Sequence, residues 1–379
     1  MTTQAERPTA DQATFASLDP RDGSTIATHP VHTPEQVREV VDRARSVADW
    51  WSELGFDGRR TRLAAWRRLL IARTEELAAL VSRETGKPLD DARIEVVLVI
   101  DHLHWAGKHA KAALGRKRFE AGALMINHRA TIEYRPLGVI GVLGPWNYPV
   151  FTPMGSIVYA LAAGNAVVFK PSELTPGVGA WLVDSFAAVL RRGAVDALGD
   201  EGQVPPVLQL VTGEGATGAA LCRSGVDKIA FTGSTATAKR VMGTCAETLT
   251  PVLVECGGKD ALIVDADADL DAAAAAVVWG AMSNGGQTCV GVERVYVVDT
   301  VAEDLLVRVA RRAARVRPGS ASNSSYGPVT MPSQVGVISG HIDDALDRGA
   351  VQQGMDVDAD AFVELRPRGH APGAHQPSC

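Results

Sequence analysis

The chain has 379 residues, of which 46% are hydrophobic and 22% charged, and its formal net charge is -6. This length allows two domains with sizeable cores, and the negative balance argues against a broad surface for nucleic acid or an anionic membrane. No apolar run reaches the roughly 18 residues of a membrane span, and no signal-peptide core is visible near the start. Five separated cysteines without a Cys-x-x-Cys pair favour reduced thiols in a cytoplasmic protein, with no metal site.

The first half of the chain is predicted to be mainly helical. The first thirty residues are polar and turn-rich, and we expect them to wrap loosely on the surface. From Pro34 apolar residues recur at helical spacing behind Thr33, which is a typical helix cap. Further helices are predicted over about 60–84 and 90–113. The tryptophans of these segments are interpreted as packing anchors: Trp50, Trp51, Trp66 and Trp105.

After about residue 128, short apolar runs alternate with helical stretches. The predicted strands are 131–134, 139–143, 166–169, 207–211, 228–231, 251–254 and 261–264. The predicted helices are 177–190, 217–224, 235–245 and 270–282. Such alternation indicates an α/β fold with a parallel sheet covered on both faces, whose ligands bind at the carboxyl ends of the strands.

Three residues at such positions could carry chemistry. Cys289 lies in the glycine-rich turn NGGQTC, so it is either a thiolate nucleophile or a small buried hydrophobic residue. Asn147, in the rigid turn GPWNYP, could stabilise an oxyanion with its neutral amide or only bond to the local backbone. Glu255 follows a strand and could activate water from a partly apolar pocket, or remain solvated.

Other segments suggest a nucleotide site. Lys170 and Glu173, in FKPSE, could bind ribose hydroxyls or form a surface ion pair. Ser234, in FTGST, begins a helix whose N-terminus suits a pyrophosphate, although it could be an ordinary cap. The run 213–218 fits G-x-G-x-x-G, but Glu214 would repel phosphate, so we interpret it as a turn into a helix.

Taken together, the segments PWNYP, KPSE, FTGST, Glu-x-Gly-Gly-Lys and Gly-Gln-x-Cys resemble the aldehyde dehydrogenase family in order and approximate spacing. The likeness covers roughly residues 15 to 362. It implies an α/β aldehyde dehydrogenase-like fold with a Rossmann-type NAD-binding domain over 1–254, which includes the N-terminal helices. It further implies a small oligomerisation arm near 128–136 and an incomplete α/β catalytic domain over 255–362.

The resemblance also implies roles for individual residues. Cys289 matches the nucleophile, Glu255 the general base and Asn147 the side-chain half of the oxyanion hole. The cofactor contacts would be Trp146, Lys170, Ser172, Glu173, Gly233 and Ser234. The aldehyde tunnel would be lined by Tyr148, Phe151, Thr152 and Gly155, and the small Gly155 suggests a roomy tunnel.

The implied activity is NAD(P)-dependent oxidation of an aldehyde to a carboxylic acid through a cysteine thiohemiacetal and a thioester. Glu173 favours NAD, with NADP as the alternative. Within the family, the overall sequence is most similar to the bacterial succinate-semialdehyde dehydrogenases and the broad-range aldehyde dehydrogenases. The family's homodimer or homotetramer would be the assembly, and no nucleic acid or membrane partner is expected.

The sequence departs from the family pattern towards its C-terminus. A Glu-x-Phe-Gly-Pro segment, whose glutamate holds the nicotinamide ribose in the family, is absent. We therefore expect a C-terminally truncated chain whose residues 363–379 derive from a shifted reading frame, which puts turnover and dimer pairing in doubt. Two alternatives to an active dehydrogenase remain: a pseudoenzyme that binds nucleotide without turnover, and a cofactor-free cysteine acyl-transfer enzyme.

Overall fold

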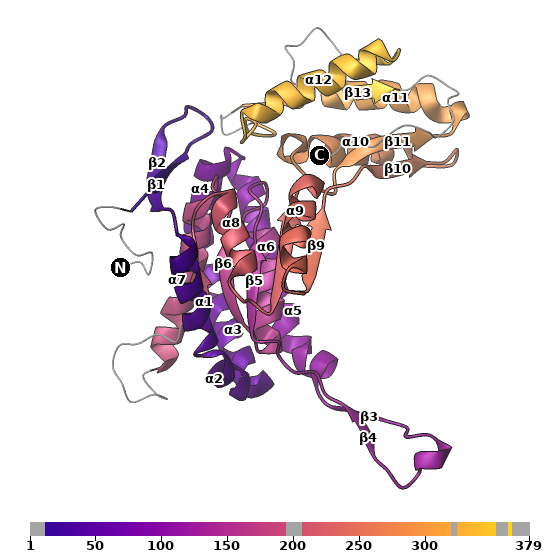
Figure 1. Cartoon of the computed structure of the whole chain (residues 1–379). Coiled ribbons are helices and arrows are strands. Elements are labelled where there is room, and N and C mark those ends of the chain that lie inside the picture. Colours follow the sequence, from indigo (N-terminus) through magenta and orange to yellow (C-terminus); the bar gives the residue numbers. More distant parts are fainter. Residues whose placement is uncertain (1–11, 195–206, 320–323, 354–362, 366–379) are drawn as a thin grey trace.

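A computed structural model describes residues 12–194, 207–319, 324–353 and 363–365. Figure 1 shows a central parallel sheet between helices, a second group of helices and strands at one end, and a narrow arm at the other. Most of the aberrant tail predicted from the sequence, 366–379, lies outside the described residues. In the described ranges no helix is long and apolar enough to cross a membrane.

The N-terminal segment is an ordered hairpin, so the predicted loose wrapping is wrong for its described part. Strand β1 (Thr14–Leu18) pairs antiparallel with β2 (Thr25–Pro30). The buried Ser17 hydroxyl donates to Glu84 Oε1 at 2.8 Å, which anchors the hairpin to the helices behind it. Thr33 then caps the next helix as predicted, in a capping box with Gln36.

Five helices follow, and two of the sequence-based expectations need correction. The helices are α1 (Pro34–Arg45), α2 (Ala48–Glu53), α3 (Gly55–Ala72), α4 (Thr74–Thr85) and α5 (Leu89–Leu114). The single helix predicted over 60–84 is two, because Arg73 leaves the helical conformation with φ -118° and ψ 24°. Trp51 and Trp66 are fully buried anchors, whereas Trp105 is 48% exposed and is not one.

The central sheet has the order β7-β6-β5-β8-β9, and all its pairings are parallel. Its strands are β5 (Val139–Leu143), β6 (Ala166–Lys170), β7 (Leu208–Leu210), β8 (Lys228–Gly233) and β9 (Val252–Cys256). All five were predicted, with ends within two residues. Since Leu143 pairs with both Lys170 and Phe231, the turns that follow these strands lie at one edge of the sheet.

Helices cover both faces of this sheet, as expected for a parallel sheet. The connecting helices are α6 (Phe151–Ala163), α7 (Pro176–Ala194), α8 (Gly215–Arg223) and α9 (Thr235–Ala246). One buried cluster joins the sheet to α3–α7, and another joins it to α1, α8 and α9. Because the chain turns from β7 back to β8 on the other side of β5, the strand order reverses between β5 and β8. Such a reversal is where open α/β sheets bind ligands.

The distal group of elements follows β9 and has a small core of its own (Figure 1). It consists of β10 (Asp260–Val264), α10 (Leu270–Met282), the 3-10 turn η2 (Ser283–Gly286), β11 (Val292–Val297), α11 (Asp299–Ala313) and α12 (Ser333–Asp347). Strands β10 and β11 are parallel, and the short β12 (Val351–Gln353) and β13 (Val363–Leu365) pair antiparallel.

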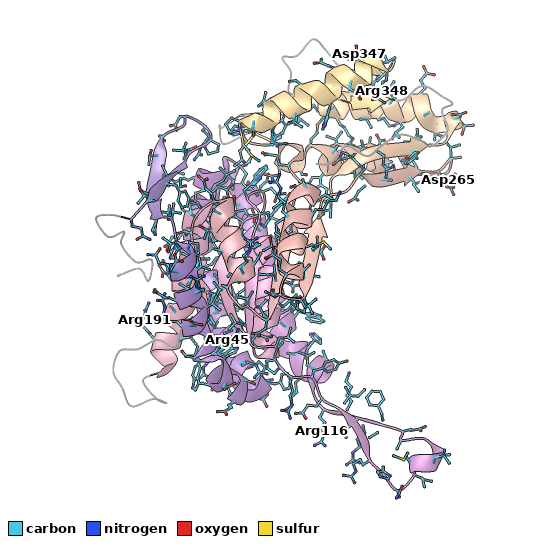
Figure 2. The ribbon with its side chains drawn as sticks, viewed as in Figure 1. Arg45, Arg116, Arg191, Asp265, Asp347 and Arg348 are labelled. Atoms are coloured by element: carbon cyan, nitrogen blue, oxygen red, sulfur yellow. The ribbon has the colours of Figure 1, made fainter. Side chains whose placement is uncertain are left out.

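The arm is a two-stranded hairpin that projects away from the sheet (Figure 1). It is made of β3 (Lys117–Phe119), the 3-10 turn η1 (Ala123–Met125) and β4 (Ala130–Ile132). It therefore begins earlier than the predicted 128–136. Figure 2 shows Arg116 where the arm leaves the helices, and Asp265 and Arg348 at the distal group.

Candidate active site

The turn after β5 carries Asn147 and reaches the turn that carries Cys289. Asn147 Nδ2 donates to the Gln287 carbonyl at 2.8 Å, while its Oδ1 accepts from the Tyr148 N–H at 3.0 Å. The local Asx contact is thus present alongside a contact across the site. A side-chain amide has two hydrogens, so the second Asn147 hydrogen is left to donate to a ligand.

The turn that carries Cys289 contains two residues with left-handed backbone conformation. Asn284 and Gly285 have φ values of 55° and 64°. The buried Asn284 side chain donates to the carbonyls of Asn147 at 3.3 Å and Gln287 at 3.1 Å. The Tyr148 hydroxyl lies 3.0 Å from Thr288 Oγ1. Cys289 follows directly and is exposed, so it is not a buried packing residue.

The other described cysteines differ from Cys289. Cys222 and Cys245 are buried, and burial raises the pKa of Cys222 to about 12. Cys256 is half-buried. Of these four cysteines, Cys289 is the one whose side chain is exposed.

Glu255 lies near the end of β9, paired with Thr232, at the same edge of the sheet. Its side chain is exposed on the edge strand β9, which agrees with the solvated alternative and not with a partly apolar pocket. Within the described ranges no hydrogen bond joins Glu255 to Asn147 or to Cys289. The structure brings Asn147 and the cysteine turn into direct contact.

Sequence reasoning missed a buried ion pair beneath the Asn147 turn. Lys87 Nζ lies 2.5 Å from Glu95 Oε1, and both side chains are 1% exposed. Lys87 also donates to the Asn147 carbonyl at 2.7 Å. The sequence places Lys87 just beyond a helix end at Gly86, which is correct, but no local pattern links it to a turn sixty residues later.

Lys170 and Glu173 lie at the end of β6 in a partly buried setting. Lys170 is 7% exposed, its Nζ donates to the Pro171 carbonyl at 2.9 Å, and Glu173 Oε2 lies 3.8 Å away. Burial lowers the pKa of Lys170, against the raising effect of Glu173 and Glu214. The ion pair with Glu173 is therefore present, but its lysine is buried and only its carboxylate is on the surface. Ser172 is buried and its hydroxyl accepts from the Leu174 N–H at 3.2 Å.

The N-terminus of α9 faces the same edge. Ser234 caps it, accepting from the Thr237 N–H at 3.2 Å, and Gly233 has no room for a Cβ because the Phe231 ring would lie 2.7 Å away. Trp146 is half-buried in the turn after β5. The N-terminus of α9 lies at the strand-order reversal, and Lys170 ends β6 at the same edge of the sheet. This arrangement fits a dinucleotide. The run 213–218 is a turn into α8, as predicted.

The predicted tunnel residues form one side of α6 and the turn before it. Phe151 packs its ring 5.3 Å from that of His102 on α5, and His102 bonds to the Tyr159 hydroxyl at 2.7 Å. No atom lies within 4 Å of a Cβ built on Gly155. In the described ranges no group of three or more His, Cys, Asp or Glu residues is arranged to hold a metal ion.

Comparisons with known proteins agree with this geometry. The model of the aldehyde dehydrogenase family matches residues 8–364. The chain is 34% identical over 344 residues to a 4,4'-diapolycopene aldehyde oxidase of Methylomonas sp, covering 90% of this chain and 62% of that protein. It is also 34% identical over 344 residues to a "Probable succinate-semialdehyde dehydrogenase" (NADP+) of Sinorhizobium fredii, covering 89% and 66%. The chain thus spans less than two thirds of the length of these relatives.

Solved structures show the same likeness. A crystal structure of an aldehyde dehydrogenase from Brucella melitensis biovar abortus 2308 superposes with a TM-score of 0.84 at 30% identity, covering 93% of this chain and 71% of that one. An NAD-dependent aldehyde dehydrogenase from Sinorhizobium meliloti superposes with a TM-score of 0.83 at 29% identity, covering 91% and 67%.

Proposed function

Since the chain belongs to the aldehyde dehydrogenase family, we propose that it oxidises an aldehyde to a carboxylic acid with NAD(P). The observation that carries the proposal is the 2.8 Å bond from Asn147 Nδ2 to Gln287, two residues before the exposed Cys289. A neutral amide donor beside the turn that carries an exposed thiol supports the proposal, because acyl chemistry at a carbonyl uses such a pair.

The residues divide the reaction between them. The Cys289 thiolate adds to the aldehyde carbon, and the carbonyl oxygen becomes an oxyanion held by Asn147 and the Cys289 backbone N–H. A bound nicotinamide dinucleotide supplies the acceptor for the hydride that leaves this carbon. The oxyanion then re-forms a carbonyl, as a thioester on Cys289. Glu255 takes a proton from water, which attacks the thioester, releases the acid and restores the thiolate.

Cofactor binding belongs to this proposal. Lys170, Ser172 and Glu173 would hold the adenosine ribose, and Gly233 and Ser234 would lie beside the pyrophosphate, with Trp146 close to the cofactor. Support comes from the burial of Lys170 at the sheet edge and from the capped N-terminus of α9. Two carboxylates near Lys170 support NAD over NADP, because a 2′-phosphate adds negative charge there.

We extend the proposal to the organisation of the chain. Residues 1–254 would bind the cofactor and 255–362 would belong to the catalytic domain, with the arm joining copies into a homodimer or homotetramer. A cytoplasmic location is supported by the four described cysteines, all of which are free. Tyr148, Phe151, Thr152 and Gly155 would line the path of the aldehyde, for which succinic semialdehyde is the first candidate.

The test is the formation of reduced nicotinamide, followed by absorbance, with NAD and a panel of succinic semialdehyde, acetaldehyde and cinnamaldehyde. We expect signal from the wild type, none from Cys289→Ala, and wild-type signal from the matched variant Cys256→Ala. Turnover by Cys289→Ala would contradict the proposal. A folded wild type that binds NAD without turnover would instead support the pseudoenzyme, and ester hydrolysis without NAD would support the acyl-transfer enzyme.

A further inference from the structure

Lys87 and Glu95 form an ion pair in a place where charge is costly. Both side chains are 1% exposed. Burying an ion pair costs desolvation that the attraction between the charges often fails to offset, so such a pair is weak evidence of a stabilising role. What the pair contacts is therefore the better guide to what it does.

Together the two side chains hold the turn that carries Asn147 at two points, at Asn147 and after it. Lys87 Nζ donates to the Asn147 carbonyl at 2.7 Å and lies 4.3 Å from the centre of the Tyr148 ring. Glu95 Oε2 accepts from the N–H groups of Val150 at 3.1 Å and Phe151 at 3.2 Å, at the start of α6. The turn is thus held at the Asn147 carbonyl and again where it enters α6.

A series of hydrogen bonds also leads from Asn147 back to the backbone just before Lys87. Asn147 donates to the Gln287 carbonyl, and Gln287 Oε1 accepts from the Thr330 N–H at 2.9 Å. The Thr330 hydroxyl donates to the Thr85 carbonyl at 2.7 Å, two residues before Lys87. With the bond from Lys87 to Asn147, these hydrogen bonds join the Lys87 turn, the asparagine turn, the cysteine turn and the segment around Thr330.

We propose that Lys87, with Glu95 as its counter-ion, is a positioning residue that holds the Asn147 amide where an oxyanion forms on the Cys289 adduct. This inference rests on the proposed function. An oxyanion donor is effective because it is already aimed before charge develops, and a small misplacement costs much of the rate. Because the Lys87 side chain is 1% exposed and contacts the Asn147 carbonyl, its effect would pass through Asn147.

The experiment compares Lys87→Met and the charge-free double variant Lys87→Met/Glu95→Gln, each with and without Asn147→Ala. The double variant is included because Lys87→Met alone leaves a buried unpaired carboxylate and is at risk of misfolding. Lys111→Met is the matched control, since Lys111 forms an exposed ion pair with Asp57. Circular dichroism confirms that each variant is folded.

We expect Lys87→Met/Glu95→Gln to lower kcat about 10- to 100-fold, up to the loss seen on removing one oxyanion donor. The KM for NAD should stay within about twofold of wild type, because binding is not the step affected. Alkylation of Cys289 by iodoacetamide, which forms no oxyanion, should keep its rate. In the Asn147→Ala background the double variant should cause no further loss of kcat.

Two results would overturn the inference while leaving the proposed function intact. One is wild-type kcat in the folded double variant. The other is an equal loss of kcat with and without Asn147, because a general structural effect does not depend on that side chain. A wild-type chain that forms no reduced nicotinamide would overturn the proposed function, and this inference with it.

Discussion

Asn147 has one amide hydrogen bonded to Gln287 and one left over, and the proposed chemistry depends on the second. Asn147→Asp keeps the shape but removes both donors and adds a negative charge. We expect kcat to fall about 100- to 1000-fold, the usual cost of losing an oxyanion donor. Single-turnover formation of reduced nicotinamide measures it. A loss confined to KM would show that Asn147 only binds the aldehyde.

Glu173 adjoins Lys170, and Glu214 also acts on that lysine. Two carboxylates against one ammonium leave a negative balance that opposes a 2′-phosphate. Glu173→Gln should therefore raise the ratio of kcat/KM for NADP over NAD, by about tenfold if one pair of charges governs the choice. Glu247→Gln, which removes an exposed carboxylate paired with Arg223 elsewhere, is the control. An unchanged ratio would remove Glu173 from cofactor selection.

Gly155 leaves open space on the side of α6 that carries Phe151. A tryptophan there meets no atom at its Cβ and fills the proposed aldehyde path. We expect Gly155→Trp to lower kcat/KM for cinnamaldehyde about tenfold or more and to spare acetaldehyde. Gly243→Trp is the matched control, because Gly243 on α9 is equally open. Equal losses for both aldehydes would mean that Gly155 does not line the path.

At the scale of elements, a helix or strand could be predicted from the sequence where its own residues show the pattern that forms it. Strands β5 and β6 are short apolar runs that are buried at every position, so the sequence pattern alone reveals them. The β1–β2 hairpin was missed because its buried positions include Ser17 and His29, which read as surface residues.

The candidate site divides in the same way. Cys289 and Asn147 lie in distinctive turns that a local sequence pattern can single out, whereas Lys87 contacts a turn sixty residues away. Trp105 was misjudged because a helical pattern does not say which face another element covers.

The hairpin should make stability depend on pH. His29 is 9% exposed, its Nε2 has no hydrogen-bond partner in the described part of the chain, and burial lowers its pKa. Below the unfolded-state pKa of about 6.5, the unfolded chain takes up a proton that the folded chain resists. The free energy of unfolding should therefore fall as pH drops from about 7.5 to about 5.5.

The variant His29→Gln isolates this effect. It removes the titrating group, so urea unfolding at the two pH values should show a smaller difference than in the wild type. Part of the difference should remain, because burial also lowers the pKa of His102. An identical difference in wild type and variant would contradict the role of His29.

At the scale of the whole molecule, the sheet and the distal group are joined through the site itself. Gln287 and Thr330 belong to the distal side, and they bond to Asn147 and Thr85 on the sheet side. The cysteine turn is thus part of the contact between the two bodies. A change that loosens this contact is expected to affect catalysis before it affects the fold of either part.

The arm exposes apolar side chains that one copy of the chain does not cover. Leu124 and Ile126 at its tip are 98% and 87% exposed, on a hairpin that projects from the rest (Figure 1). Apolar side chains gathered on a projecting hairpin are typical of a surface buried by a partner. Leu124→Glu/Ile126→Glu would place two charges in that contact, so we expect sedimentation velocity to show smaller species than for the wild type.

Leu249→Glu, at an 88% exposed leucine away from the arm, should leave the assembly unchanged. A wild type that sediments as a monomer, or an arm variant with the wild-type distribution, would show that the arm does not join copies of this chain.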